Sequence, residues 1–197
     1  MEKKKMSVTA IVLIAVAAIV LWAIGAYNGL VKSEEKVKTA WSQVENVYQR
    51  RADLIPNLVA TVKGYASHES STLEGVVEAR AKATQVSISA DNLTEEKIAE
   101  FQKAQGELGS ALGRLMAISE AYPDLKANEN FRDLQAQLEG TENRIATERK
   151  NYNQTARDYN TSIRVFPKNL IASIFSFQAK GYFEAQEGAE TAPIVEF

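Results

Sequence analysis

The sequence predicts an all-α protein, with one N-terminal transmembrane helix followed by an antiparallel up-and-down bundle of about four long helices. Three observations predict this: an uncharged apolar run near the N-terminus, a seven-residue apolar repeat late in the chain, and only four prolines and ten glycines among 197 residues. The expected organisation is an N-terminal tail and transmembrane anchor over residues 1–31, a helical bundle over 32–184, and an acidic linker with an apolar docking tail over 185–197.

The anchor is predicted from residues 6–31, which contain no charged side chain. A membrane-crossing helix needs about 20 such residues, and the run is too long for a cleaved signal peptide. Trp22 and Tyr27 lie toward its far end, where an aromatic belt is expected. Three lysines at positions 3–5 precede the run, so we expect the N-terminus in the cytoplasm and the bulk of the chain on the non-cytoplasmic side.

Helical spacing continues beyond the membrane at Val37, Trp41, Val44 and Tyr48. Pro56 lacks an N–H and crowds the carbonyl of Ala52, so a kink or break is expected there. The helix is expected to resume and to end near residues 66–68. Ser70 or Ser71 is the expected cap of the next helix, with Glu74 in the capping-box position.

A further helix is predicted to start at Asn92 or Thr94, acting as its N-cap, and to stop at Pro123. Within it, three glycines lie three and four residues apart. Each costs up to about 1 kcal/mol relative to alanine in a helix, so we expect another backbone to approach closely. These glycines are Gly106, Gly109 and Gly113.

The seven-residue repeat predicts a long helix that begins after Asn128, its expected N-cap, and is stopped by Pro167. A strict spacing of seven favours a left-handed supercoil against a neighbouring helix. We interpret the repeat as bundle core, with a face offered to another copy of the chain as the alternative. Its members are Phe131, Leu138, Ile145, Tyr152, Tyr159 and Phe166.

Residues 170–177 form a short apolar run that cannot span a bilayer. It is expected to be a core-capping helix, an interfacial helix or a subunit contact, and to end at Gly181 before an exposed Tyr182–Phe183 pair. The chain then closes with apolar residues that a free tail rarely carries, so we expect this tail to dock, with a neighbouring subunit as one candidate. The docking residues would be Ile194, Val195 and Phe197.

The candidate interaction site is a charged segment around the proline. The simplest interpretation is a salt-bridged surface turn, and the functional one is a docking site for a partner or for lipid head groups. It comprises Arg50, Arg51, Asp53, Pro56 and Asn57.

His68 and Glu69 form a second candidate. Adjacent helical side chains point about 100° apart and do not chelate a metal together. Protonation of His68 as a pH sensor is the other hypothesis for this pair.

Composition argues against several function classes. The net charge of −2 gives no footprint for nucleic acid. With no cysteine and one histidine, disulfides and multi-histidine metal sites within one chain are excluded, and no cofactor is expected. The carboxylate pairs Glu34–Glu35 and Glu95–Glu96 are explained by juxtamembrane and first-turn positions. Since no nucleophile elbow, phosphate loop or zinc-protease motif occurs, we do not expect an enzyme.

The segment Arg50–Glu69 resembles the signature of the LemA family of bacterial membrane proteins. The likeness extends from about Tyr27 to the C-terminus. It implies a single N-terminal membrane crossing followed by an antiparallel helical bundle, and it brings no established catalytic activity. Other matching segments are Tyr27-Asn28, Trp41, Ala79-Arg80, Glu120–Asn128, Glu139–Ile145, Tyr152-Asn153, Tyr159-Asn160 and Phe166-Pro167.

These features predict a single-pass protein of the bacterial inner (cell) membrane. Its expected role is a non-enzymatic, self-associating structural or interaction scaffold at the cell envelope. Its expected partners are the lipid bilayer, further copies of itself and other envelope membrane proteins. The alternative is a receptor-like module that recognises a peptide or lipid head group through the Arg50–Asn57 segment.

Overall fold

The computed structural model describes residues 8–184, and these residues form six helices and no strand. The all-α prediction is therefore confirmed. The helices are α1 (Val8–Tyr65), α2 (Ser70–Gln85), α3 (Glu95–Ser119), α4 (Pro123–Ala127), α5 (Glu129–Arg164) and α6 (Lys168–Ile174).

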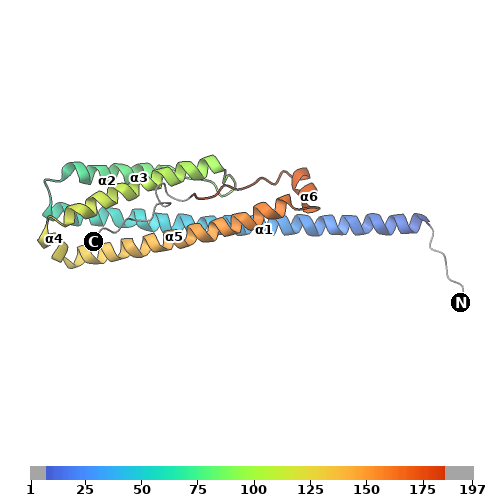
Figure 1. Ribbon diagram of the computed structural model, residues 1–197, viewed down its shortest axis with the longest axis horizontal. Helices are drawn as coiled ribbons and strands as arrows, with labels where there is room; N and C mark the ends of the chain where they lie inside the picture. The colour runs from blue at the N-terminus through green and yellow to red at the C-terminus, as the bar shows by residue number, and fades with distance from the viewer. Residues whose placement is uncertain (1–7, 185–197) are drawn as a thin grey trace, which may run out of the picture.

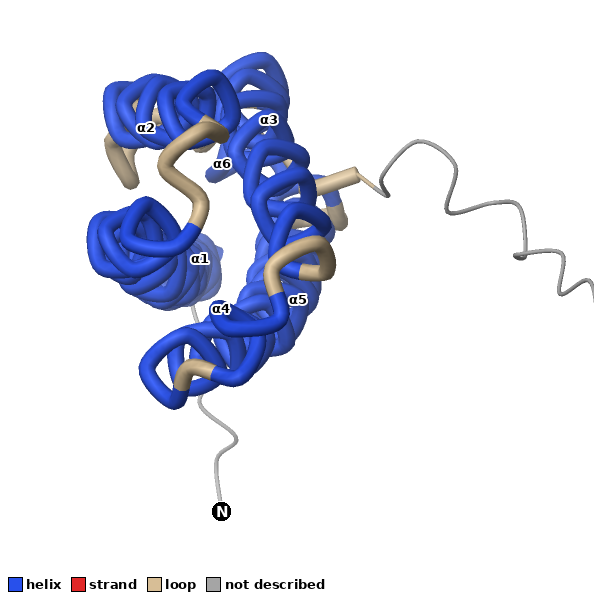
Figure 2. Tube along the Cα trace, turned by 90° about the vertical axis from the view of Figure 1, so that its left-hand side faces the viewer, coloured by secondary structure: helices blue, strands red, loops and turns tan. Residues whose placement is uncertain are grey.

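The four long helices form two antiparallel pairs. α5 runs back along α1, and α3 runs back along α2, which itself packs on α1 (Figures 1 and 2). The first part of α1 extends beyond the bundle on its own (Figure 1). This part contains an 18-residue stretch that is long and apolar enough to cross a membrane, and none of it is buried.

The helix starts agree with the predicted caps in two of three cases. The Asn128 side chain accepts a hydrogen bond from the Phe131 N–H at 3.0 Å, and the Thr94 hydroxyl accepts one from the Lys97 N–H at 3.4 Å. The predicted capping box at the start of α2 is wrong. Glu69 occupies the cap position without a side-chain hydrogen bond, and Ser70 is already helical.

The core consists of two apolar clusters stacked along the bundle. The cluster nearer the free part of α1 is rich in aromatic rings and includes Trp41 and Tyr152, whereas the distal one is mostly aliphatic around Leu58 and Leu115. Five members of the seven-residue repeat are buried, from Phe131 to Tyr159. Phe166 breaks the prediction, because α5 ends at Arg164 and leaves this ring 80% exposed.

Of the kink or break predicted at Pro56, the break does not occur, because α1 continues through this residue. A proline cannot donate to the carbonyl four residues earlier, here that of Ala52. The Arg80 guanidinium of α2 replaces the missing donor, since its Nε donates to the Ala52 carbonyl at 2.7 Å. A side chain from a neighbouring helix thus satisfies the carbonyl that the proline leaves free.

This arrangement predicts coupling between Arg80 and Pro56. We expect Arg80→Met to lower the free energy of unfolding by about 1.5 kcal/mol, because a charged donor to a shielded carbonyl is lost. In a Pro56→Ala background the new N–H bonds to Ala52, so the same substitution should cost less than about 0.5 kcal/mol. Denaturant unfolding of the four chains measures the coupling. Equal costs in both backgrounds would show that Arg80 does not serve the proline.

Candidate functional site

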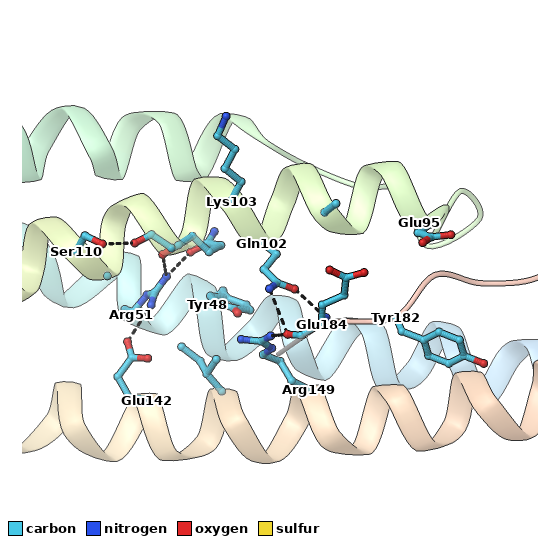
Figure 3. Close-up of a pocket in the computed structure, with 15 residues that line it drawn as sticks. Tyr48, Arg51, Glu95, Gln102, Lys103, Ser110, Glu142, Arg149, Tyr182 and Glu184 are labelled. Carbon is cyan, nitrogen blue, oxygen red and sulfur yellow. Dashed lines mark hydrogen bonds and ion pairs between the residues drawn. The ribbon is translucent and has the colours of Figure 1, made fainter. Parts of the chain in front are cut away.

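A cavity of about 870 Å³ lies between α3 and α5, with Tyr48 and Arg51 of α1 also lining it (Figure 3). It exists because α3 packs mainly on α2 and α5 packs mainly on α1. Three basic and three acidic side chains line it, so its formal charges balance. These are Arg51, Lys103 and Arg149, and Glu95, Glu142 and Glu184.

Arg51 is the buried charge of this cavity, with only 4% of its side chain exposed. Its Nη1 donates to the Glu142 carboxylate at 2.9 Å, and its Nη2 donates to the Gln105 carbonyl at 3.0 Å. The same Nη2 also donates to the Gln105 side-chain oxygen. One guanidinium therefore joins α1, α3 and α5 in the layer between the two apolar clusters.

The helical spacing of α1 explains this placement. The buried stripe runs Trp41, Val44, Tyr48, Arg51, Ile55 and Leu58, with steps of three and four residues. Arg51 therefore occupies a core position of the stripe. The spacing of the apolar residues in the sequence already indicated this position. Tyr48, one turn earlier, offers its ring at 5.0 Å from the Arg51 guanidinium carbon. Burial raises the pKa of Tyr48 above its usual value, so the phenol stays neutral.

One end of the cavity is bordered by an extended segment, residues 177–184, which we call the C-terminal strap. Three side-chain amides bind its backbone. Each amide binds one strap residue and pairs with both the N–H and the carbonyl of that residue. Asn160 holds Lys180 with two bonds of 2.8 Å, and Asn153 holds Phe183 with bonds of 2.9 and 2.8 Å. Gln102 of α3 holds Glu184 in the same way, at 3.1 and 3.2 Å.

Two more side chains also bind this backbone. Arg149 donates to the Glu184 carbonyl at 2.7 Å, and the Tyr152 hydroxyl donates to the Gly181 carbonyl at 3.0 Å. Figure 3 shows Gln102 and Arg149 meeting at Glu184 from opposite helices. The strap is therefore clamped between α3 and α5.

The spacing of the two asparagines matches the geometry of the strap. Seven residues of helix rise about 10.5 Å at 1.5 Å each, and three residues of extended chain span about 10 Å. Asn153 and Asn160 are seven residues apart, and the residues they hold, Phe183 and Lys180, are three apart. Sequence reasoning missed these asparagines. The available signal was the repeated Tyr-Asn pair, in which the tyrosine is core and the next residue faces the strap.

Contacts also fix two strap side chains and the strap backbone at Gly181. The buried Lys180 Nζ lies 2.8 Å from a Glu34 carboxylate oxygen. Phe183 is 5% exposed and stacks on Trp41, so the prediction that it is exposed is wrong. Gly181 does not end a helix as predicted, since α6 already ends at Ile174. Instead it passes so close to α3 that an added Cβ would lie 2.6 Å from the Glu95 Cα.

The segment Arg50–Asn57 is helical, so its interpretation as a turn is wrong. Arg51 alone faces the cavity, while Arg50, Asp53, Pro56 and Asn57 are exposed. The Asp53 carboxylate accepts a hydrogen bond from the Gln49 side chain at 2.8 Å. Helical geometry places Arg50, Asp53 and Asn57, at spacings of three and four residues, on one exposed face of α1, whereas Arg51 points into the cavity. The structure therefore separates Arg51 from the other candidates.

His68 and Glu69 lie in the connection between α1 and α2, where α1 ends as predicted. The His68 side chain is exposed, and Glu69 accepts a hydrogen bond from the Tyr122 hydroxyl at 3.2 Å. The tail residues Ile194, Val195 and Phe197 lie outside the described residues, as does the predicted 185–197 segment.

The expected close backbone approach at the α3 glycines is wrong. A Cβ added at Gly106 or Gly113 would have no neighbour within 4 Å, and one at Gly109 would meet only the Arg51 Nη1 at 4.0 Å. Gly106 and Gly109 line the cavity instead. The absence of side chains there leaves room between α3 and α5.

Comparison with known proteins relates the chain to one family. It is 29% identical to the magnetosome protein MamQ 2 of Paramagnetospirillum magneticum, over 92% of this chain and 73% of that protein. It is 29% identical to the magnetosome protein MamQ of Magnetospirillum gryphiswaldense, over 94% and 74%. It is 24% identical to the protein LemA of Metamycoplasma hominis, over 83% and 71%. The LemA family model matches residues 40–197, and the chain belongs to the LemA family.

Proposed function

We propose that this protein is a single-pass, membrane-anchored helical bundle that acts without catalysis as a self-associating interaction scaffold at the bacterial cell envelope. The observation that carries the proposal is the free part of α1: an exposed apolar stretch, long enough to cross a membrane, that continues without a break into the bundle. Exposed apolar surface of this length would be unfavourable in water and is stable in lipid.

The chemistry of the cavity supports a role in binding rather than catalysis. Its buried cation is paired with Glu142 and Gln105, and Arg149 binds the strap backbone. Groups held in this way join helices, whereas a catalytic acid or base would face a reacting group. We propose the inner membrane as the location, with the bundle on the non-cytoplasmic side.

Light scattering coupled to size exclusion tests self-association of the full chain in mild detergent. We expect a defined multiple of the chain mass that persists on dilution through the micromolar range. A single chain per micelle throughout that range would contradict the scaffold proposal. Cross-linking in native membranes then identifies further envelope partners.

A second candidate function is a receptor-like module for extended polypeptide, favoured by the way the strap is held. Three side-chain amides bind its backbone, and backbone contacts place few demands on sequence. The cavity continues beyond Glu184 toward Arg51 and Ser110, and its balanced charges suit a peptide. The Arg50–Asn57 segment would contribute only Arg51 to such a site.

A fluorescent peptide with the sequence of residues 177–184 tests this second function on the full chain. We expect weak binding to the native chain, where the groove is occupied, and clearly tighter binding to Gly181→Ala, where the chain's own strap is displaced. A peptide carrying the same glycine-to-alanine change is the matched control and should bind neither chain. Equal, negligible anisotropy changes for both chains and both peptides would exclude the groove as a peptide site.

A further inference from the structure

The turn between α5 and α6 exposes an unusual amount of apolar surface. Phe166 is 80% exposed and Ile174 is 71% exposed, although both are large hydrophobic residues. We call this surface the α5–α6 corner; it comprises Val165, Phe166, Leu170, Ile174 and Phe175. Only Ile171 and Ala172 of α6 are buried in the bundle, so α6 is apolar on its outer face as well.

The α5–α6 corner lies where the free part of α1 enters the bundle. The Phe175 ring centroid is 4.7 Å from that of Tyr27, and the Phe177 centroid is 5.8 Å from it. Figure 1 shows α6 beside α1 at the end of the bundle from which α1 extends alone. The corner is therefore next to the last residues of the apolar stretch.

We infer that the α5–α6 corner inserts into the lipid interface and is a second membrane contact of this protein. The inference rests on the proposed membrane anchor. Because α1 is one continuous helix, Val8–Tyr27 rises about 30 Å, which matches the hydrocarbon thickness of a bilayer. If Val8–Tyr27 spans the hydrocarbon layer, Tyr27 lies at the membrane surface, and so does Phe175, which contacts it. Aromatic and aliphatic side chains are favoured at that depth.

The charges around the corner fit the same occupant. Between Asn160 and Phe177 the charged residues are Arg164 and Lys168, and both are basic. Basic side chains beside inserted apolar ones are attracted to anionic head groups. A bilayer accounts for the apolar surface, its basic residues and its continuity with the apolar stretch of α1 together. Attachment at two points would also restrict rotation of the bundle about the axis of α1.

The chain has no cysteine, so single spin labels report membrane depth without other changes. Full-length Phe166→Cys and Ile174→Cys chains are labelled and reconstituted in phosphatidylcholine vesicles containing phosphatidylglycerol. Collision rates with oxygen and with a water-soluble nickel chelate are then measured. Leu13→Cys, in the apolar stretch, is the control for depth, and Val77→Cys, 53% exposed on α2, is the control for water. All four side chains are exposed, so the substitutions should leave the fold intact.

We expect the oxygen-to-nickel ratio at positions 166 and 174 to be several-fold higher than at 77 and lower than at 13. A ratio equal to that at 77, with position 13 deep, would overturn the corner contact and leave the anchor intact. A low ratio at position 13 as well would overturn the anchor itself. Shielding from both reagents at 166 and 174, relieved by diluting the protein in lipid, would assign the corner to a second copy and overturn the inference.

Discussion

Replacing Arg51 by methionine should lower the free energy of unfolding by about 3 kcal/mol. The guanidinium donates to Glu142 of α5 and to two oxygens of Gln105 on α3 while almost fully buried. Removing one partner of a buried polar network leaves the others unsatisfied, which costs about 3–5 kcal/mol when every member is shielded. Glu142 is half exposed and can return to water, so we expect the lower end of that range. Unfolding by guanidinium chloride in mild detergent, monitored by circular dichroism, measures the change in the free energy of unfolding.

Two controls separate the network from a general effect of losing charge. Arg50→Met removes the adjacent, exposed arginine and should change stability by less than about 0.5 kcal/mol. Arg51→Met combined with Gln105→Leu removes the buried side-chain acceptor as well, together with the 3.2 Å bond from the Gln105 amide to the Ala83 carbonyl. This double variant should recover part of the loss, because an apolar pair leaves fewer unsatisfied groups than a broken polar pair. A double variant as unstable as the sum of the two single losses would contradict this account.

The sequence predicted the architecture well because long-range periodicity determines it. The apolar run identified α1, and the seven-residue repeat identified α5. These two helices pack against each other more extensively than any other pair among the described residues. Helix ends at Asn128 and Thr94 followed from local hydrogen bonding. These features depend on residues close in the chain or on a regular spacing, and a single sequence displays both.

The candidate site was predicted less well because its residues are distant in the chain. Arg51 and Gln105 are 54 positions apart, and Arg51 and Glu142 are 91 apart. The charged segment around Pro56 drew attention to Arg51 but also to four exposed neighbours, since local composition does not show which face of a helix is covered. Continuing the stripe of Trp41 and Tyr48 by one turn would have placed Arg51 in the core.

The proline illustrates the same limit. Local chemistry correctly identified the carbonyl of Ala52 as the group that loses its partner. It could not supply the Arg80 side chain that replaces this partner from α2, so it overestimated the disruption. Tertiary contacts of this kind decide whether a helix breaks.

Gly181→Ala should displace the C-terminal strap and lower the free energy of unfolding by about 2 kcal/mol. The added Cβ would lie 2.6 Å from the Glu95 Cα, 2.7 Å from the Glu95 nitrogen and 2.9 Å from the Thr94 carbonyl carbon. All three atoms belong to backbone at the start of α3, which cannot rotate away as a side chain would. Overpacking of this kind typically costs about 1–3 kcal/mol. Here it also breaks the 2.8 Å bond from the Gly181 N–H to the Leu93 carbonyl.

Gly106→Ala is the matched control, because it makes the same chemical change where nothing lies within 4 Å. It should raise stability by about 0.5–1 kcal/mol through the better helix propensity of alanine. Amide hydrogen exchange separates strap release from general loosening. In Gly181→Ala the N–H groups of Lys180 and Phe183, which now donate to Asn160 and Asn153, should exchange faster, while amides in the middle of α5 keep their rates. If the amides of Lys180 and Phe183 stayed protected, this result would contradict the account. The close contact with α3 would then not require glycine at position 181, and the bonds to Asn153 and Asn160 alone would hold the strap.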